Sequence, residues 1–126
     1  MKIFLDANDY PTSSDTLEAA DSYLDTREMF STKVLTGATL SFDIGGSDGT
    51  HKVYIKFHNG NNWMKYHLAI DDANNSTFSS DDTVEINLGL QEFWKSTVAG
   101  VRVRITRETG EGDVPITNGI LNVNTD

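Results

Sequence analysis

The chain has 126 residues, a formal net charge of −9 and no cysteine. A chain of this length is expected to form one domain, residues 1–126, with a core that needs no disulfide or thiolate-bound metal. The negative charge argues against nucleic acid and against an anionic membrane surface as partners, because both would repel it.

The amino terminus, "MKIFLDANDY", lacks the apolar stretch of a signal peptide. No run approaches the roughly 18 apolar residues of a membrane-spanning helix. We therefore expect a protein that stays in the cytoplasm or leaves the cell inside a larger particle, such as a virion.

Apolar residues alternate with polar ones in short blocks separated by Gly, Asn, Asp and Ser. This period of two predicts β-strands. The expected strands are residues 2–7, 39–44, 51–58, 63–70, 83–88, 100–106 and 119–124. With strands through "SYLDT" and "MFSTKVL" before residue 39, they predict about eight strands and little helix, which is typical of a β-sandwich or barrel.

Two stretches have a less regular pattern. Residues 14–30 contain helix formers after a possible N-cap at Ser14, but they also fit a loop followed by strands, which we favour. Residues 90–97 predict one helical turn or a loop crossing that buries Phe93 or Trp94.

Four segments resemble the galactose-binding-domain-like jelly rolls used by many carbohydrate-binding modules. They are "SYLDTREMFSTKVLTGATLSFDIGG", "GTHKVYIKFHNGNNWMKYHL", "FWKSTVAGVRVRI" and "PITNGILNV". The resemblance implies an all-β, antiparallel, jelly-roll-like β-sandwich. That family often holds a structural calcium near the chain ends, where Asp6, Asp9 and Asp126 lie. No ligand spacing matches, so no cofactor is assigned.

The dipeptide Asn59-Gly60 is typical of a two-residue type I′ turn, in which both positions have positive φ. That turn would place Lys56 opposite Trp63. A four-residue loop, 59–62, would instead pair His58 with Trp63 and oppose two lysines, which is unfavourable, so we favour the shorter turn.

Both registers have the same parity. They place Met64, Tyr66, Leu68 and Ile70 toward the core. They place on the opposite face the side chains of Lys52, Tyr54, Lys56, His58, Trp63, Lys65 and His67.

If the strand at 100–106 lies in the same sheet, Arg102 and Arg104 join this face. The predicted binding face is then Tyr54, Lys56, His58, Trp63, Lys65, His67, Arg102 and Arg104. Two interpretations remain open. The face is either a solvated strand surface or a docking surface for an acidic protein or a glycan, with exposed aromatic anchors.

Other candidates are weaker. Trp94 is expected in the core, with a sugar-stacking platform as the alternative. The loop 71–82 carries Asp71, Asp72, Asp81 and Asp82, but their spacing matches no EF-hand, so a solvated acidic loop is favoured over a metal site.

No catalytic set is recognisable. Of the three histidines, His51 is expected to face inward, and nothing places a nucleophile beside a base. A carboxylate pair such as Asp43 and Glu85 is conceivable, but nothing selects it among 19 acidic residues.

We therefore predict no enzyme and carry two hypotheses. The first is a structural protein of a larger assembly, such as a phage capsid decoration, spike or tail-associated subunit, which would bind capsid or tail proteins, with a homo-oligomer as a further option. The second is a carbohydrate-binding module that recognises a glycan through Trp63 and Tyr54.

Overall fold

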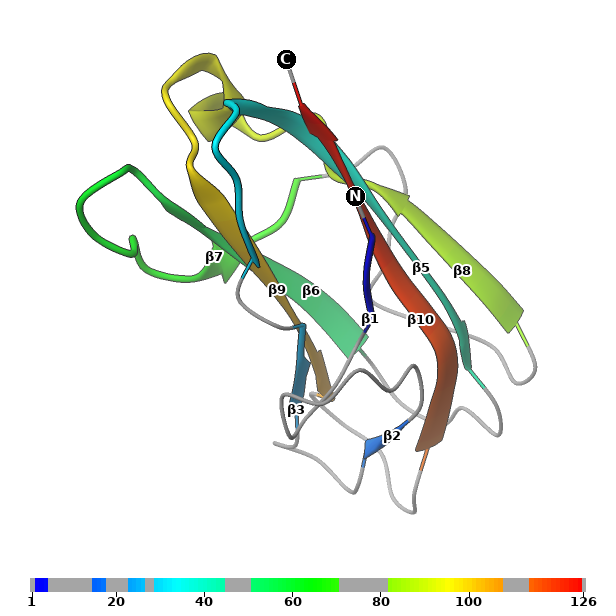
Figure 1. Ribbon diagram of the computed structural model, residues 1–126. Helices are drawn as coiled ribbons and strands as arrows, with labels where there is room; N and C mark the ends of the chain where they lie inside the picture. Colours follow the sequence, from blue (N-terminus) through cyan, green and yellow to red (C-terminus); the bar gives the residue numbers. More distant parts are fainter. Residues whose placement is uncertain are drawn as a thin grey trace.

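The computed structural model describes residues 2–4, 15–17, 23–26, 29–44, 51–70, 82–107 and 114–125. Within these ranges the chain forms ten strands and one short 3₁₀ helix, η1 (Figure 1). The elements are β1 (Lys2–Phe4), β2 (Asp15–Leu17), β3 (Tyr23–Asp25), β4 (Met29–Phe30), β5 (Leu35–Ile44), β6 (His51–His58), β7 (His67–Leu68), β8 (Asp82–Asn87), η1 (Glu92–Lys95), β9 (Gly100–Arg107) and β10 (Val114–Thr125).

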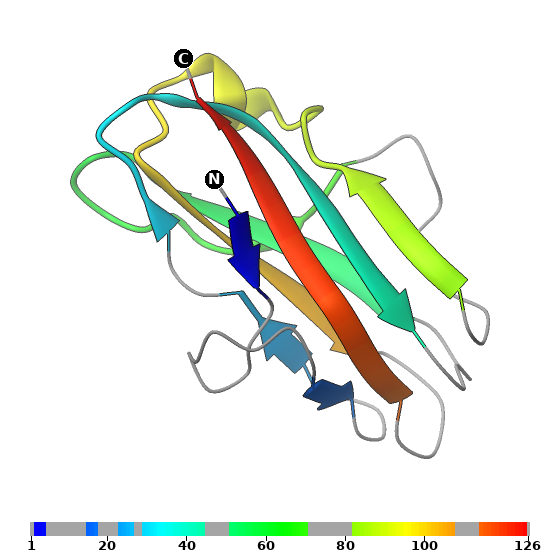
Figure 2. The same cartoon turned by 45° about the vertical axis from the view of Figure 1, so that its right-hand side comes forward.

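The strands form two sheets that face each other, as Figures 1 and 2 show. The first sheet has the order β1-β10-β5-β8, and β2 also pairs with β10. The second sheet has the order β3-β9-β6-β7, and β4 also pairs with β9. All of these pairs are antiparallel. The prediction of an all-β antiparallel sandwich is therefore confirmed, with short strands added to the expected set.

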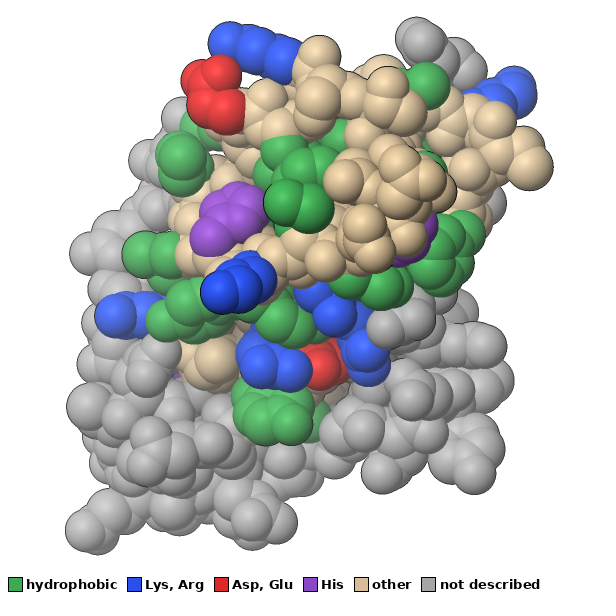
Figure 3. Space-filling view, turned by 90° about the vertical axis from the view of Figure 1, so that its left-hand side faces the viewer, with side chains coloured by type: hydrophobic (Ala, Val, Ile, Leu, Met, Phe, Trp, Pro, Cys, Tyr) green, Lys and Arg blue, Asp and Glu red, His purple; other side chains and the backbone are tan. Residues whose placement is uncertain are grey.

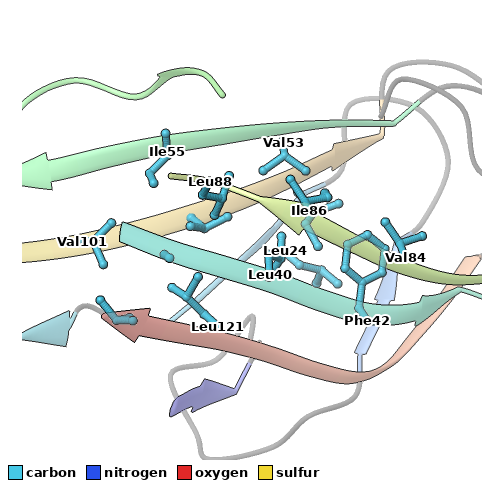
Figure 4. Packing of buried hydrophobic residues seen from close by; sticks show 14 of the residues in the cluster. Leu24, Leu40, Phe42, Val53, Ile55, Val84, Ile86, Leu88, Val101 and Leu121 are labelled. Atoms are coloured by element: carbon cyan, nitrogen blue, oxygen red, sulfur yellow. The ribbon is translucent and has the colours of Figure 1, made fainter. Parts of the chain in front are cut away.

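The core lies between the two sheets and follows from the alternation in the sequence. In β5 every second residue from Ala38 to Ile44 is buried, and in β9 every second residue from Val101 to Ile105 is buried. Figure 4 shows side chains from both sheets meeting in this space. His51 is also buried, as expected.

Two connections between the sheets close one end of the sandwich. Residues 31–34 lead from β4 in the second sheet to β5 in the first. There, Ser31 N donates to Ala99 O at 2.9 Å and Leu35 N to Val98 O at 3.0 Å. The return connection contains η1, whose Phe93 and Trp94 pack against the core. The expected helical turn in 90–97 is thus confirmed.

Several predictions fall outside the described residues. They concern Ser14, the acidic residues Asp6, Asp9 and Asp126, and the loop 71–81. Within 14–30, the described parts are strands β2, β3 and β4, in agreement with the favoured interpretation.

Candidate binding face

The second sheet presents positively charged residues on its outer side. β6 and β9 are neighbours, and their register places Lys56 opposite Arg102 and Tyr54 opposite Arg104. The side chains between these positions point into the core. The expectation that the strand at 100–106 adds Arg102 and Arg104 to this face is therefore confirmed.

The hairpin after β6 differs from the register that we favoured. His58 pairs with Trp63, and Asn59 N donates to Asn62 O at 3.1 Å, so the loop has four residues. Gly60 has a φ of 102°, but Asn59 does not have positive φ, and a type I′ turn requires it at both positions. The Asn59 side chain explains the difference, because its Oδ1 accepts hydrogen bonds from the amides of Asn61 and Asn62.

The expected strand at 63–70 is mostly absent. Only the two residues of β7 pair with β6, as Tyr54 with Leu68 and Ile55 with His67. This register is shifted by one residue from the His58–Trp63 pair, so the parity changes between them. The prediction that Met64, Tyr66, Leu68 and Ile70 point inward is wrong: Met64, Leu68 and Ile70 are exposed, and Tyr66 lies half-buried against the cationic side chains.

Tyr66 joins two cations that the sequence alone does not connect. Lys56 Nζ lies 4.8 Å from the centre of the Trp63 ring and 4.9 Å from that of the Tyr66 ring. Arg104 Cζ lies 4.3 Å from the centre of the same Tyr66 ring and 4.0 Å from that of Tyr23. The rings therefore hold both cations in fixed positions, because cations are attracted to the electron-rich faces of aromatic rings.

One carboxylate lies among the cations. Asp25 accepts two hydrogen bonds from Arg104, at 2.7 and 3.0 Å, and an Arg102 nitrogen lies 3.8 Å from it. Arg102 Nε also donates to Thr26 O at 2.7 Å. The hydrogen bond to Asp25 raises the pKa of Arg104, against a smaller opposing effect of burial. Both guanidinium groups are therefore anchored to the edge of the sheet formed by β3.

An aromatic cluster borders the cations near β4. Phe30, His58 and Trp63 contact one another edge to face, with ring centres 5.1 to 5.3 Å apart. Phe30 is 53% exposed, and Tyr23, at the other end of the cations, is also 53% exposed. We name the whole surface the cation–aromatic face: Tyr23, Asp25, Phe30, Lys56, His58, Trp63, Tyr66, Arg102 and Arg104. Figure 3 shows this side of the molecule, with Lys and Arg side chains gathered around an acidic one and hydrophobic groups beside them.

The segment that carries Tyr66 is fixed by a residue far along the chain. Gln91 is buried, and its side-chain amide accepts from Ile70 N at 2.9 Å and donates to Ile70 O at 2.6 Å. It also donates to Leu88 O at 3.3 Å. This contact across 21 residues replaces regular strand pairing, and no local pattern signals it.

Six of the eight residues predicted for the face lie on it or beside it, and two do not. His67 is exposed, but it pairs with Ile55 and its ring contacts Phe93, 5.6 Å away, so it leaves the outer side of the sheet. Lys65 is exposed and makes no ion pair or ring contact within the described residues. Sequence reasoning missed Tyr23, Asp25, Phe30 and Tyr66. The alternation in "SYLDT" offered a signal for Tyr23 and Asp25, and no pattern pointed to the other two.

The remaining candidates are structural. Trp94 is packed against the core and its Nε1 donates to Leu88 O at 2.7 Å, which confirms the expectation of core packing. Asp43 accepts a hydrogen bond from Asn118 at 2.7 Å. Glu85 lies opposite Ser41 in the β5–β8 ladder, whereas Asp43 lies opposite Thr83. The described ranges contain no cluster of three or more His, Asp or Glu side chains suited to a metal. In those ranges, no helix has the length and apolar character needed to cross a membrane.

Comparison with known proteins supports the fold alone. No family profile and no curated protein matches the chain. Xylanase10C from Cellvibrio japonicus, solved in complex with xylopentaose, matches with a TM-score of 0.57 and 12% identity over 89% of this chain and 22% of that one. The infectious bursal disease virus Gt strain structure gives 0.57 and 14% identity, over 98% of this chain and 30% of that one. The VP2 subviral particle of the same virus gives 0.53 and 11%, over 98% and 31%. The chain thus spans less than a third of these proteins, which share its β-sandwich.

Proposed function

We propose that this protein is a non-catalytic structural subunit that docks through its cation–aromatic face onto an acidic surface of a larger protein assembly, such as a phage virion. The observation that carries the proposal is the arrangement of Lys56 and Arg104 against aromatic rings, with exposed rings on either side. Tyr, Phe and Arg are enriched in the cores of protein interfaces.

The fixed positions of the cations favour association. Long basic side chains normally lose conformational entropy when a partner immobilises them. Here Lys56 is already held between Trp63 and Tyr66, and Arg104 is held by Asp25 and two rings. Part of the ordering cost is therefore met before binding.

The balance of charge on the face favours an acidic partner. Arg102 and Arg104 share one described carboxylate, Asp25, and Lys56 adds a third positive charge on the same rung as Arg102. Lys56 makes no ion pair within the described residues, and it lies directly opposite Arg102. Like charges on one rung repel each other, so a partner carboxylate placed between them would relieve that repulsion and gain attraction from both.

The geometry favours a protein over a glycan as the partner. A sugar-stacking tryptophan needs an open ring face. Trp63 has Lys56 over its ring, contacts Phe30 and His58, and is only partly exposed. The exposed rings on the face are those of Tyr23 and Phe30, which suit apolar side chains of a partner as well as a sugar.

A virion is the assembly that we favour. The fold similarity to the infectious bursal disease virus structures, one of them a subviral particle, is compatible with such a role. In this proposal the protein is made in the cytoplasm, binds capsid or tail proteins, and forms a homo-oligomer. Neither a nucleic acid nor a membrane is expected as the partner, because the net charge is −9.

The second candidate is a carbohydrate-binding module of the galactose-binding-domain-like type. Exposure of the Tyr23 and Phe30 rings favours it, as does the fold similarity to the xylanase solved with xylopentaose. In this case the protein would bind a glycan by ring stacking, with little dependence on salt.

Capture experiments separate the two functions. Tagged protein is incubated with lysate of the producing cells at low and high ionic strength, and captured proteins are identified by mass spectrometry. Docking predicts one acidic assembly protein, retained by Lys65→Gln but lost with Lys56→Glu, Arg102→Glu or added salt, because exposed charges are screened. Light scattering before and after addition of that purified protein confirms a defined complex.

A glycan panel provides the opposite arm. Binding of a polysaccharide that survives high salt and disappears with Tyr23→Ala or Trp63→Ala would replace docking by glycan recognition. If neither set of substitutions changes any binding, the cation–aromatic face is only a solvated surface and both functions are wrong.

A further inference from the structure

The outer sides of the two sheets carry charges of opposite sign. β6 and β9 place four cations on the outer side of the second sheet: Lys52, Lys56, Arg102 and Arg104. On the outer side of the first sheet, the described charged side chains are Asp43 and Glu85, and both are acidic. The strands β5, β8 and β10 contain no Lys or Arg. Within the described residues, the sandwich therefore presents a basic surface on one side and an acidic surface on the other.

The two carboxylates are close enough together to meet a pair of cations. Glu85 lies opposite Ser41 in the β5–β8 ladder, and Asp43 is two residues further along β5 on the same face. Such diagonal neighbours in a ladder are about 7–8 Å apart. On the second sheet, Lys56 and Arg102 lie directly opposite each other. A surface that carries Asp43 and Glu85 can therefore place one carboxylate near each of these two cations.

The charges concerned are not neutralised by neighbours in their own sheet. Glu85 is exposed, and neither Glu85 nor Lys56 makes an ion pair within the described residues. Asp43 accepts a hydrogen bond at 2.7 Å from Asn118, whose side chain carries no charge to offset the carboxylate. Contact between the two surfaces would therefore bring together charges that attract each other across the interface.

The two surfaces also fit each other in shape. Many outward side chains on β5 and β8 are short and polar, such as Thr39, Ser41 and Asn87. On the cation–aromatic face, the rings of Tyr23 and Phe30 are each 53% exposed. Short side chains let exposed rings and long cations approach the backbone of the opposing sheet. The two sheets can then pack face to face at a separation of about 10 Å.

We propose that the acidic partner of the cation–aromatic face is the outer side of the first sheet in a second copy of this chain. Lys56 and Arg102 of one copy then lie against Asp43 and Glu85 of the next. This inference rests on the docking role proposed above and names the partner for it.

The arrangement of the sheets determines what such contacts produce. The outer sides of the two sheets point away from each other, as Figures 1 and 2 show. A contact between two different surfaces leaves one of each surface unused at the ends of the assembly, so further copies can add. Because the two surfaces point in opposite directions, the copies add in line and form an open stack. The average molar mass should therefore rise continuously with protein concentration and should not stop at a dimer.

The net charge of −9 opposes this association, because whole copies repel one another. Salt screens this long-range repulsion first, since the screening length is about 30 Å at 0.01 M, about 10 Å at 0.1 M and about 3 Å at 1 M. The close contacts between the two surfaces are screened only at the highest of these concentrations. We therefore expect association of the parent protein to be strongest near about 0.1 M salt and weaker at both about 0.01 M and about 1 M.

The test measures molar mass by light scattering over a wide range of protein concentration at these three salt concentrations. The variant Lys56→Glu reverses a charge on the basic surface, and Glu85→Lys reverses one on the acidic surface. We expect each to weaken self-association at least about tenfold. Lys65→Glu and Glu92→Lys make the same charge changes at exposed positions outside the two surfaces, and they should associate as the parent does.

Mixing the two face variants tests whether the contact joins two different surfaces. The intact basic surface of Glu85→Lys can bind the intact acidic surface of Lys56→Glu, so the mixture should form complexes that neither variant forms alone. A dimer that joins two cation–aromatic faces would instead respond to Lys56→Glu and not to Glu85→Lys. Circular dichroism shows whether each variant is folded, and the salt dependence of the parent needs no variant.

The proposal is wrong if the parent is monomeric at all three salt concentrations, if folded Glu85→Lys associates as the parent does, or if the mixture stays monomeric. These outcomes are distinct from failure of the docking function. A monomeric parent that captures a different acidic protein, through Lys56 but independently of Glu85, keeps the docking function and overturns only the second copy as partner. If neither self-association nor capture depends on Lys56, both are wrong.

Discussion

The β5–β8 ladder of the first sheet and the β6–β9 ladder of the second have the same inward alternation but different outward rungs. On β5 and β8 the outward pairs join small or acidic side chains, such as Ser41 with Glu85 and Thr39 with Asn87. On β6 and β9 they join Tyr54 with Arg104 and Lys56 with Arg102. Water can solvate the first set unaided, whereas the second set is covered by Tyr66, Trp63 and Tyr23. The difference indicates that the outward side chains of the second sheet hold one another in position through contacts with aromatic rings.

The largest expected effect is a difference in stability loss when a carboxylate is removed from each face. Asp25→Ala removes a buried carboxylate that accepts two hydrogen bonds from the partly exposed Arg104. We expect it to lower the free energy of unfolding by about 2 kcal/mol. Asp43→Ala, on the other face, loses an exposed bond from Asn118 and should cost less than about 0.5 kcal/mol. Urea denaturation measures both, and equal losses would show that the faces do not differ.

The inward side of both faces could be predicted from sequence, and much of the outward side could not. Alternation in 39–44, 51–58 and 100–106 identifies the core positions, because a strand with one buried face admits only one parity. It also places Lys56, Arg102 and Arg104 correctly: each arginine lies between two buried residues, and Lys56 lies between the buried Ile55 and the partly buried Phe57.

The same reasoning from alternation gave a wrong prediction for residues 63–70, for two physical reasons. The Asn59 side chain satisfies the loop amides and so permits a four-residue turn. Gln91 then binds the backbone of Ile70 in place of strand pairing. The sequence of this segment still alternates with a period of two, but most of the segment does not pair with a neighbouring strand. Tyr66 therefore contacts Lys56 and Arg104 instead of the core. The Lys56–Trp63 contact expected from the shorter turn is nevertheless present, because a long lysine side chain spans the change of register.

A second comparison is between residues of this irregular segment. Tyr66→Ala removes one ring from two cations, each contact being worth about 0.5–1 kcal/mol when exposed. We expect a loss of about 1–1.5 kcal/mol in the free energy of unfolding. Leu68→Ala, at an exposed position two residues away, should cost less than about 0.5 kcal/mol. Thermal and urea denaturation of both variants test this, and a larger loss for Leu68→Ala would contradict the role given to Tyr66.

The smallest expected effect concerns Lys56, where two forces oppose each other. Its ammonium gains attraction from Trp63 and Tyr66, but it lies directly opposite Arg102, which repels it. The variant Lys56→Met keeps the apolar stem and removes the charge, so it reports the difference. With two ring contacts against one repulsive rung, we expect a net loss of about 0.5 kcal/mol. Lys65→Met, at an exposed site where the described residues provide no ring contact, should leave stability unchanged.

The sign of the Lys56→Met effect also bears on function. A loss of stability means that the rings hold the charge more strongly than Arg102 repels it, and added salt should then change the stability of parent and variant alike. A gain means that the free protein keeps an unfavourable pair of charges on one rung. That pair, only partly offset by Asp25, would be relieved further by an anion from outside. In that case the variant that is more stable alone should bind its acidic partner more weakly, and measuring both quantities on one pair of proteins decides whether the charge serves the fold or the docking.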